Sequence, residues 1–182
     1  DFDPDTRGSL EAQIADVSDE LAYNAHDLDD GLQVGLITPD QLKSLDIWQR
    51  LCQRLQWDGH TLTEIERHRF IRELVGIMVS DVLENTSQKI TELGIDSLDD
   101  VIHQDDNVVV YSPEQKKQNR ALKDFLYENM YYHYRIVRMK NRAENFLGRL
   151  FESYLKHSNQ LPPEYEARIE KQGIHRVVAD YL

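Results

Sequence analysis

Apolar residues recur at helical spacing along nearly the whole chain, which predicts an all-α fold. Several of the expected helices begin at residues that commonly cap helix N-termini: Ser9, Thr38, Thr61 and Ser112. Gly31 is expected to stop the first helix. The expected helical segments are 9–30, one starting at 38, 45–56, one starting at 61 and running through 82, 112–133, 137–157 and 173–182.

Two stretches interrupt this helical pattern. The valine run from Asn107 to Tyr111 predicts a short strand, and Leu161-Pro162-Pro163 breaks the helix before it. There is no internal repeat, low-complexity tract or Gly/Ser linker, so residues 1–182 are expected to form a single helical unit with at most one short strand. Because the last residues stop inside an amphipathic pattern and the first helix carries a face that lacks partners, we expect the bundle to be incomplete at both ends.

Composition places the chain among ordinary globular proteins. Of its 182 residues, 40% are hydrophobic, which allows a sizeable core. Cys52 is the single cysteine, so neither an intrachain disulfide nor a thiolate metal cluster can form, and a reducing, cytoplasmic setting is expected. No apolar run approaches the roughly 20 residues that span a bilayer. We therefore expect no membrane partner.

Charge is distributed unevenly along the chain. The formal net charge of -12 argues against binding of extended nucleic acid, which depends on phosphate contacts. The segment from Pro113 to Arg142, however, contains eight basic and three acidic residues. Its charge is therefore +5, and that of the remainder is -17. Such a segment could hold a small polyanion, or its charges could cover solvated helix faces. The basic residues are Lys116, Lys117, Arg120, Lys123, Arg135, Arg138, Lys140 and Arg142.

The first expected helix has two contrasting faces. One carries apolar residues, and the opposite one carries carboxylates three and four residues apart, which repel each other by a few tenths of a kcal/mol per pair. A cation from elsewhere would relieve this repulsion, although a solvated acidic face is the simpler explanation. The apolar face holds Leu10, Ile14, Val17, Leu21, Ala25 and Leu28, and the acidic face holds Asp16, Asp19, Glu20, Tyr23, Asp27 and Asp30.

Within the acidic face lies the pattern Asp19-x-x-x-Tyr23-x-x-x-Asp27. The stretch from Ser9 to Ile37 that contains it resembles the segment after the HD motif in bacterial dGTP triphosphohydrolases, members of the HD superfamily. Ser112 to His133 and His175 to Leu182 are similar to later segments of that family, so the likeness covers nearly the whole chain. It implies a multi-helix HD-domain-like bundle, in which 1–37 is the last metal-ligand helix and 38–182 is the C-terminal helical part.

The resemblance assigns a role to each residue of the pattern. The family holds a divalent metal through a His, a His-Asp pair and a later Asp, and Asp19 matches this later Asp. Tyr23 matches a tyrosine that lies against the deoxyribose, and Asp27 matches an acceptor for the sugar hydroxyl. Spacing of four residues places the three side chains in a row along about 12 Å of helix. A bulky tyrosine there would also exclude the additional hydroxyl of a ribose.

Further substrate contacts are expected in the second half of the chain. Tyr131 and His133 match positions near the nucleotide in relatives. Basic side chains on the helix after Ser112 are candidates to neutralise a triphosphate, although only some can point inward from one helix. These candidates are Lys116, Lys117, Arg120 and Lys123.

The chain departs from the family pattern in its histidines. The His and the His-Asp pair are expected upstream of residue 1, and so are the catalytic residues. His26-Asp27 is the one His-Asp pair in the sequence, but it lies on the same helix as Asp19 and cannot wrap a metal together with it. Since one aspartate does not hold a divalent ion usefully, this chain alone is expected to be inactive. The ligand types suit Mg, Mn, Fe or Zn.

The resemblance implies that the full-length protein hydrolyses dGTP, or deoxynucleoside triphosphates generally, to the nucleoside and inorganic triphosphate. It also implies a homo-oligomer. The absence of a glycine-rich phosphate loop argues against a P-loop enzyme. Two alternatives stay open: another HD-type nucleotide phosphohydrolase or phosphodiesterase, and a non-catalytic helical module that binds nucleotide as a regulator.

Overall fold

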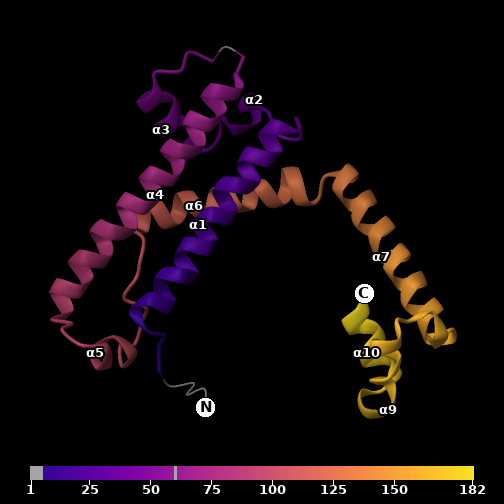
Figure 1. The fold of residues 1–182 in the computed structure, drawn as a ribbon. Helices are drawn as coiled ribbons and strands as arrows, with labels where there is room; N and C mark the ends of the chain where they lie inside the picture. Colours follow the sequence, from indigo (N-terminus) through magenta and orange to yellow (C-terminus); the bar gives the residue numbers. More distant parts are fainter. Residues whose placement is uncertain (1–5, 60) are drawn as a thin grey trace. The chain divides into compact units, whose positions relative to one another are not determined.

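The computed structural model describes residues 6–59 and 61–182, and every regular element within them is helical (Figure 1). The expected all-α fold is therefore confirmed. The described residues form two compact units, 6–131 and 132–182. The elements of the first unit are α1 (Leu10–Gln33), α2 (Pro39–Leu42), α3 (Asp46–Leu55), α4 (Glu64–Leu93), α5 (Leu98–Ile102), α6 (Pro113–Leu126) and η1 (Tyr127–Tyr131).

Helix α1 begins where the sequence predicts but continues beyond its expected stop. The Ser9 hydroxyl accepts a hydrogen bond from the Ala12 backbone N–H at 3.3 Å. Gly31 does not end the helix, which runs to Gln33. Gly31 is buried against Ile37, where a Cβ atom would lie 2.5 Å from the Ile37 Cδ1 atom. The glycine thus permits a close approach of the returning chain instead of terminating the helix.

Helix α4 is both shifted and longer than the sequence predicts. Its N-cap is Thr63, and the reciprocal partner is Glu66, so the capping box expected at Thr61 lies two residues later. The helix extends past Val82 to Leu93 because Gly94, with φ of 62°, supplies the left-handed residue that ends it.

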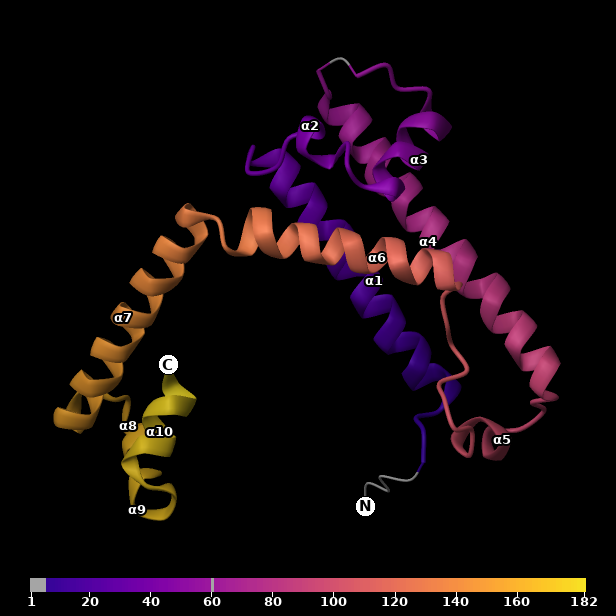
Figure 2. The ribbon, with the colours of Figure 1, turned by 180° about the vertical axis from the view of Figure 1, so that it is seen from behind.

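The core of the first unit lies where α1, α3, α4 and α6 meet, and α6 crosses α1 (Figures 1 and 2). Trp48 of α3 stacks on Phe70 of α4 with ring centroids 4.6 Å apart. One turn earlier on α4, the buried Arg67 guanidinium donates to the Asp29 carboxylate, which ties α4 to α1. The Arg67–Asp29 pair fixes α1 against α4, and the shared buried core packs α1 against α6 as well.

The valine run before α6 is buried but is not a strand. The backbone N–H groups of Val108 and Val109 both donate to the Gln13 Oε1 atom, at 2.7 and 3.1 Å. The Val110 N–H donates to the Thr86 hydroxyl at 3.2 Å. Since side chains from α1 and α4 satisfy these donors, the segment needs no neighbouring strand, and the strand prediction is wrong.

The helix expected from 112 to 133 is divided. Its start is confirmed, since the Ser112 hydroxyl accepts from the Gln115 N–H at 3.1 Å. The α-helical part ends at Leu126, and a π-helical turn, η1, follows. In a π-helix each N–H bonds to the carbonyl five residues earlier, so the turn is wider than an α-helical one.

The second unit begins with α7 (Tyr134–Lys156) and is built on a small core of its own. Leu161, Val177 and Val178 are buried there, and the break at 161–163 is confirmed because Pro163 starts a new short helix. The remaining elements are η2 (Ser158–Gln160), α8 (Pro163–Glu166), α9 (Ile169–Gln172) and α10 (Ile174–Tyr181). That all 182 residues form one helical unit stays a prediction.

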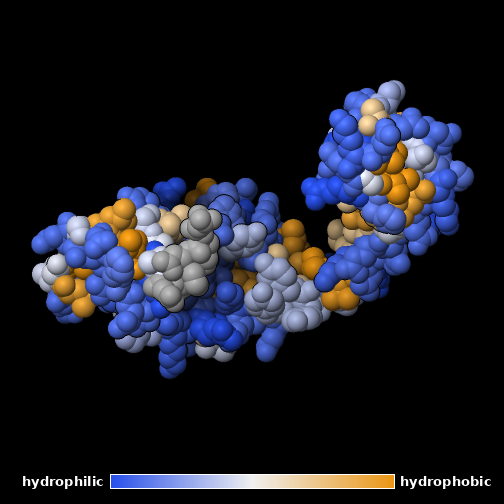
Figure 3. Space-filling model, turned by 90° about the horizontal axis from the view of Figure 1, so that it is seen from below, coloured by the Kyte–Doolittle hydropathy of each residue, from blue (hydrophilic) through white to orange (hydrophobic). Residues whose placement is uncertain are grey.

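Most of the face drawn in Figure 3 is hydrophilic, with apolar residues in separate patches. Among the described helices, none combines the length and the apolar character that crossing a membrane would require.

Candidate functional site

A cavity of about 420 Å³ lies between α1 and the run formed by α6 and η1. Both walls are fixed by packing, because Leu21, Ala25 and Leu28 of α1 and Leu122 and Leu126 of α6 belong to the same buried core. The cavity is lined by Asp16, Asp19, Glu20, Tyr23, Asn24 and Asp27 from α1, and by Lys123, Leu126, Tyr127 and Tyr131 from the opposite wall.

The acidic face of α1 forms one wall of this cavity. Asp19, Tyr23 and Asp27 all line it, in the order that their four-residue spacing dictates. Asp19 is exposed, and 61% of Tyr23 is accessible to solvent. The three residues are therefore accessible to a ligand that enters from solvent.

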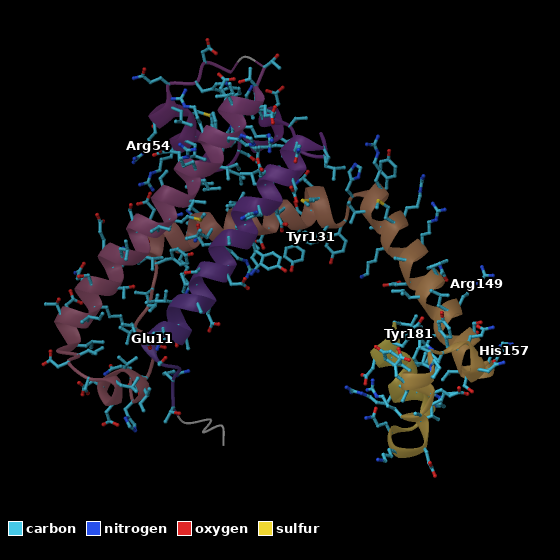
Figure 4. All side chains as sticks on the ribbon, in the orientation of Figure 1. Glu11, Arg54, Tyr131, Arg149, His157 and Tyr181 are labelled. Carbon is cyan, nitrogen blue, oxygen red and sulfur yellow. The ribbon has the colours of Figure 1, made fainter. Side chains whose placement is uncertain are left out.

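Tyr131 closes the cavity at the Asp27 end. Its hydroxyl donates a hydrogen bond to the Asp27 carboxylate, and its ring stacks on Tyr127 at a centroid distance of 5.0 Å. Tyr131 lies at the end of the α6–η1 run, next to α1 (Figure 4). The hydrogen bond to Asp27, followed by partial burial, raises the pKa of Tyr131 to about 12. The phenol therefore stays protonated and remains a donor at neutral pH.

Lys123 brings a positive charge to the acidic wall. Its Nζ atom lies 3.5 Å from the Glu20 Oε1 atom, with both side chains close to half exposed. Lys123 is thus a cation from another helix that relieves part of the repulsion among the carboxylates of α1. It is a salt bridge of modest strength, because solvent screens it.

The other basic candidates on α6 lie outside this cavity. Lys116 lines a neighbouring cavity of about 530 Å³, together with Arg7, Lys89 and Glu20. Arg120 is exposed and pairs with Asp124 one turn along the same helix, at 3.0 Å. Lys117 is exposed and lines neither cavity. Of the four basic candidates, only Lys123 lines the same cavity as Asp19, Tyr23 and Asp27.

His133 belongs to the second unit. It caps the start of α7, where its Nδ1 atom accepts from the Arg135 backbone N–H at 3.3 Å. Its ring is 4.7 Å from that of Tyr134. The role near a nucleotide that the resemblance implies for His133 stays a prediction.

Sequence reasoning did not select several lining residues. Asn24 is 5% exposed, and within residues 6–59 and 61–182 its Nδ2 atom has no hydrogen-bond partner. Tyr127 joins the wall because it precedes Tyr131 by four residues and stacks on it. A search for neighbours four residues from each expected site residue would have found Tyr127. It would not have found Asn24. That residue is distinguished only by the lack of a hydrogen-bond partner for its amide within the described residues.

The residues that the structure describes do not by themselves fit a metal site. Within the part of the chain that the structure describes, no group of three or more His, Cys, Asp or Glu side chains is placed to hold an ion. Asp19 could offer one carboxylate, and stable coordination needs several ligands.

Comparisons with known proteins show what this chain is similar to. Residues 109–182, which include α6 and η1, match a sequence family described as a phosphohydrolase-associated domain. Two relatives, from Geobacter sulfurreducens and Geobacter metallireducens, are 39% and 40% identical over 183 residues, and the alignments cover all of this chain. A relative from Deinococcus deserti is 38% identical over 174 residues, or 96% of the chain. Each is named deoxyguanosinetriphosphate triphosphohydrolase-like protein.

Over its full length, this chain is homologous to the dGTP triphosphohydrolase-like proteins. The resemblance inferred from Ser9 to Ile37 is thereby confirmed. The chain spans about half the length of these relatives, 46% to 47% in the three alignments. Both walls of the cavity fall within the part shared with the dGTP triphosphohydrolase-like proteins.

Proposed function

We propose that the full-length protein hydrolyses a deoxynucleoside triphosphate, dGTP in the first instance, to the deoxynucleoside and inorganic triphosphate. The observation that carries this proposal is the single cavity in which Asp19, Tyr23 and Asp27 line one wall and Tyr131 the other. The similarity to proteins named deoxyguanosinetriphosphate triphosphohydrolase-like supports it.

In this proposal the Asp27 end of the cavity holds the sugar. Because Tyr131 donates to one carboxylate oxygen of Asp27, that carboxylate is oriented, and its remaining lone pairs can accept a sugar hydroxyl. The exposed ring of Tyr23 offers an apolar surface for the deoxyribose. Its bulk would leave no room for the additional hydroxyl of a ribose.

The other end of the row is assigned to the phosphates. Asp19 is proposed as one ligand of a divalent cation, Mg, Mn, Fe or Zn, whose other ligands come from parts of the protein beyond this chain. Such a cation supplies a polarised phosphate and an activated water when bound. Since the described residues do not form a metal site, we assign no catalytic step to them. Lys123 would offset part of the negative charge near Glu20.

We further propose that the protein is a cytoplasmic homo-oligomer that acts on free nucleotides. Its net charge of -12 is unfavourable for extended nucleic acid, whose phosphates it would repel. A mononucleotide requires only a local site of suitable charge.

Product analysis of the full-length protein tests the proposal. Incubated with dGTP and a divalent metal, the protein should release inorganic triphosphate and deoxyguanosine. Release of pyrophosphate or orthophosphate would instead indicate another HD-type phosphohydrolase. Binding of dGTP without any product would indicate a regulatory module.

A further inference from the structure

The rings of Tyr127 and Tyr131 stack on each other along the cavity wall that faces α1. Their centroids are 5.0 Å apart, and their planes differ by 28°. Residues four apart on a helical run are neighbours, and nearly parallel rings at this separation attract each other by stacking. Tyr131 therefore makes two contacts at the cavity, one through its ring to Tyr127 and one through its hydroxyl to Asp27.

The hydrogen bond from Tyr131 to Asp27 lacks the protection of a buried site. Tyr131 is 39% exposed, so water competes for its hydroxyl and for the carboxylate. It is also the last residue of η1, and helix ends fray. A tyrosine that is free to change rotamer loses that freedom whenever it bonds to Asp27. The bond therefore depends on what restrains the ring of Tyr131.

Tyr127 is placed to provide this restraint. It directly follows Leu126, which is 1% exposed and belongs to the core shared by α1 and α6. Its backbone is thus anchored one turn before the exposed end of η1. Among the described residues, the ring that stacks on Tyr131 is that of Tyr127, and through this stack Tyr131 is attached to the packed part of the wall.

We infer that Tyr127 is a positioning residue: by stacking on Tyr131, it holds the Tyr131 hydroxyl against Asp27 and so keeps that carboxylate oriented toward the sugar hydroxyl of the substrate. The inference rests on the proposed function for the identity of the ligand. It assigns a role to a residue that the pattern of Asp19, Tyr23 and Asp27 does not contain. Removal of the Tyr127 ring should therefore weaken the preference for substrates that carry the sugar hydroxyl.

Steady-state kinetics of the full-length protein test this selectivity. In Tyr127→Ala the KM for dGTP should rise by about two- to tenfold, as in Tyr131→Phe, with kcat changed less. Dideoxyguanosine triphosphate has no free sugar hydroxyl, so its inhibition constant against dGTP hydrolysis should change far less. A general distortion of the cavity would instead weaken binding of both nucleotides equally, and that result would overturn the inference.

Two further variants isolate the ring of Tyr127. Tyr127→Phe keeps the stack and should restore the KM of the wild type. Tyr132→Ala is the matched control, because Tyr132 is 71% exposed, neighbours Tyr131 in sequence and does not line the cavity. It should leave the KM for dGTP unchanged.

A double-mutant cycle tests whether Tyr127 acts through Tyr131. When the Tyr131 hydroxyl is already absent, Tyr127→Ala has no hydrogen bond left to weaken. The KM of the double variant with Tyr131→Phe should therefore equal that of Tyr131→Phe alone. Additive increases in KM would overturn the inference, because they would show that Tyr127 contacts the substrate independently.

Nuclear magnetic resonance supplies a test without turnover. The pKa of Tyr131 is raised to about 12, first by its hydrogen bond to Asp27. In full-length protein with ¹³C-labelled tyrosine, Tyr131 should ionise at a lower pH in Tyr127→Ala than in Tyr127→Phe, because the bond is weakened only when the ring is removed. An equal pKa in the two variants would overturn the inference. So would the absence, in the wild type, of nuclear Overhauser effects between the two rings.

The product assay separates this inference from the proposed function. A lowered pKa of Tyr131 in Tyr127→Ala without triphosphate release by the wild type would reject the proposed reaction alone. Triphosphate release together with wild-type KM in Tyr127→Ala would reject the role of Tyr127 alone.

Discussion

The Tyr131 hydroxyl donates a hydrogen bond to the Asp27 carboxylate across 104 residues of sequence. This bond joins η1 to α1 at one end of the cavity and orients the carboxylate that is proposed to accept the sugar hydroxyl. Tyr131→Phe removes the bond and keeps the ring. In the full-length protein the KM for dGTP should rise by about two- to tenfold, with kcat changed less, because a ground-state contact is weakened. Steady-state kinetics measure this, with Tyr132→Phe, an exposed neighbour, as the control.

The contribution of the Tyr131–Asp27 hydrogen bond to stability should be measurable at alkaline pH. The pKa of Tyr131 is raised to about 12, first by its hydrogen bond to Asp27, and that of Tyr111 is raised to about 12, first by burial. Because the folded pKa exceeds the ordinary value near 10, the stabilisation is fully present below pH 10 and is lost as the pH rises through 12. The free energy of unfolding of the wild type should therefore fall over this window. Urea titrations at several pH values should show a shallower fall in Tyr131→Phe and the shallowest in the double variant with Tyr111→Phe.

Two substitutions on α1 should separate turnover from sugar discrimination. Asp19→Ala in the full-length protein should abolish turnover, since it removes a proposed metal ligand. Tyr23→Ala should retain turnover and mainly loosen discrimination against ribonucleotides. The measurement is kcat/KM for dGTP and GTP in each variant. Normal turnover in Asp19→Ala would contradict the role assigned to that carboxylate.

The attachment of α4 to α1 depends on a buried ion pair. The Arg67 side chain is 8% exposed and that of Asp29 26%, so Arg67→Leu leaves a carboxylate partly buried without its partner. The expected loss is about 3 kcal/mol in the free energy of unfolding. Arg54 pairs with Glu73 at 2.5 Å, but its side chain is 54% exposed, and Arg54→Leu should cost less than about 1 kcal/mol. Equal losses by urea unfolding would show that burial does not distinguish the two pairs.

Gln13 should control the stability of the buried valine segment. Gln13→Ala leaves the N–H groups of Val108 and Val109 without their acceptor, at an expected cost of about 3 kcal/mol. Hydrogen exchange at these two amides should accelerate. Gln13→Glu keeps the acceptor oxygen and should preserve more of the protection. Gln49→Ala, which removes an exposed side-chain bond to the Lys43 carbonyl, should leave the exchange of these amides unchanged.

How much of this structure can be predicted from the sequence depends on how far apart in the chain the interacting residues lie. Helical periodicity and caps such as Ser9 and Ser112 are local, and they placed the starts of α1 and α6 correctly. The four-residue spacing from Asp19 to Tyr23 likewise predicted a shared face. The valine run was mistaken for a strand because its partner, Gln13, lies 95 residues away, and no local pattern reveals that contact. Ile14, expected on the buried stripe of α1, is 47% exposed, because neighbouring helices cover only part of that face.

The lining of the candidate site shows the same limit. Residues on one helix could be assigned to one face, whereas the choice of Lys123 from four basic residues depended on how α6 crosses α1. The lack of a hydrogen-bond partner for the Asn24 amide within the described residues could not be predicted, because it depends on which groups the fold places around that amide.

The π-helical turn Tyr127–Tyr131 gives the far wall of the cavity a particular sensitivity to chain length. A π-turn accommodates one residue more than an α-turn. Deleting one residue before Tyr131 would restore regular α winding, and Tyr131 would keep its direction toward Asp27, because four residues of α-helix and five of π-helix cover nearly the same rotation. Inserting one residue would exceed what the π-turn absorbs and would turn Tyr131 away from Asp27 by about 100°. This turn should therefore tolerate the loss of one residue far better than the gain of one.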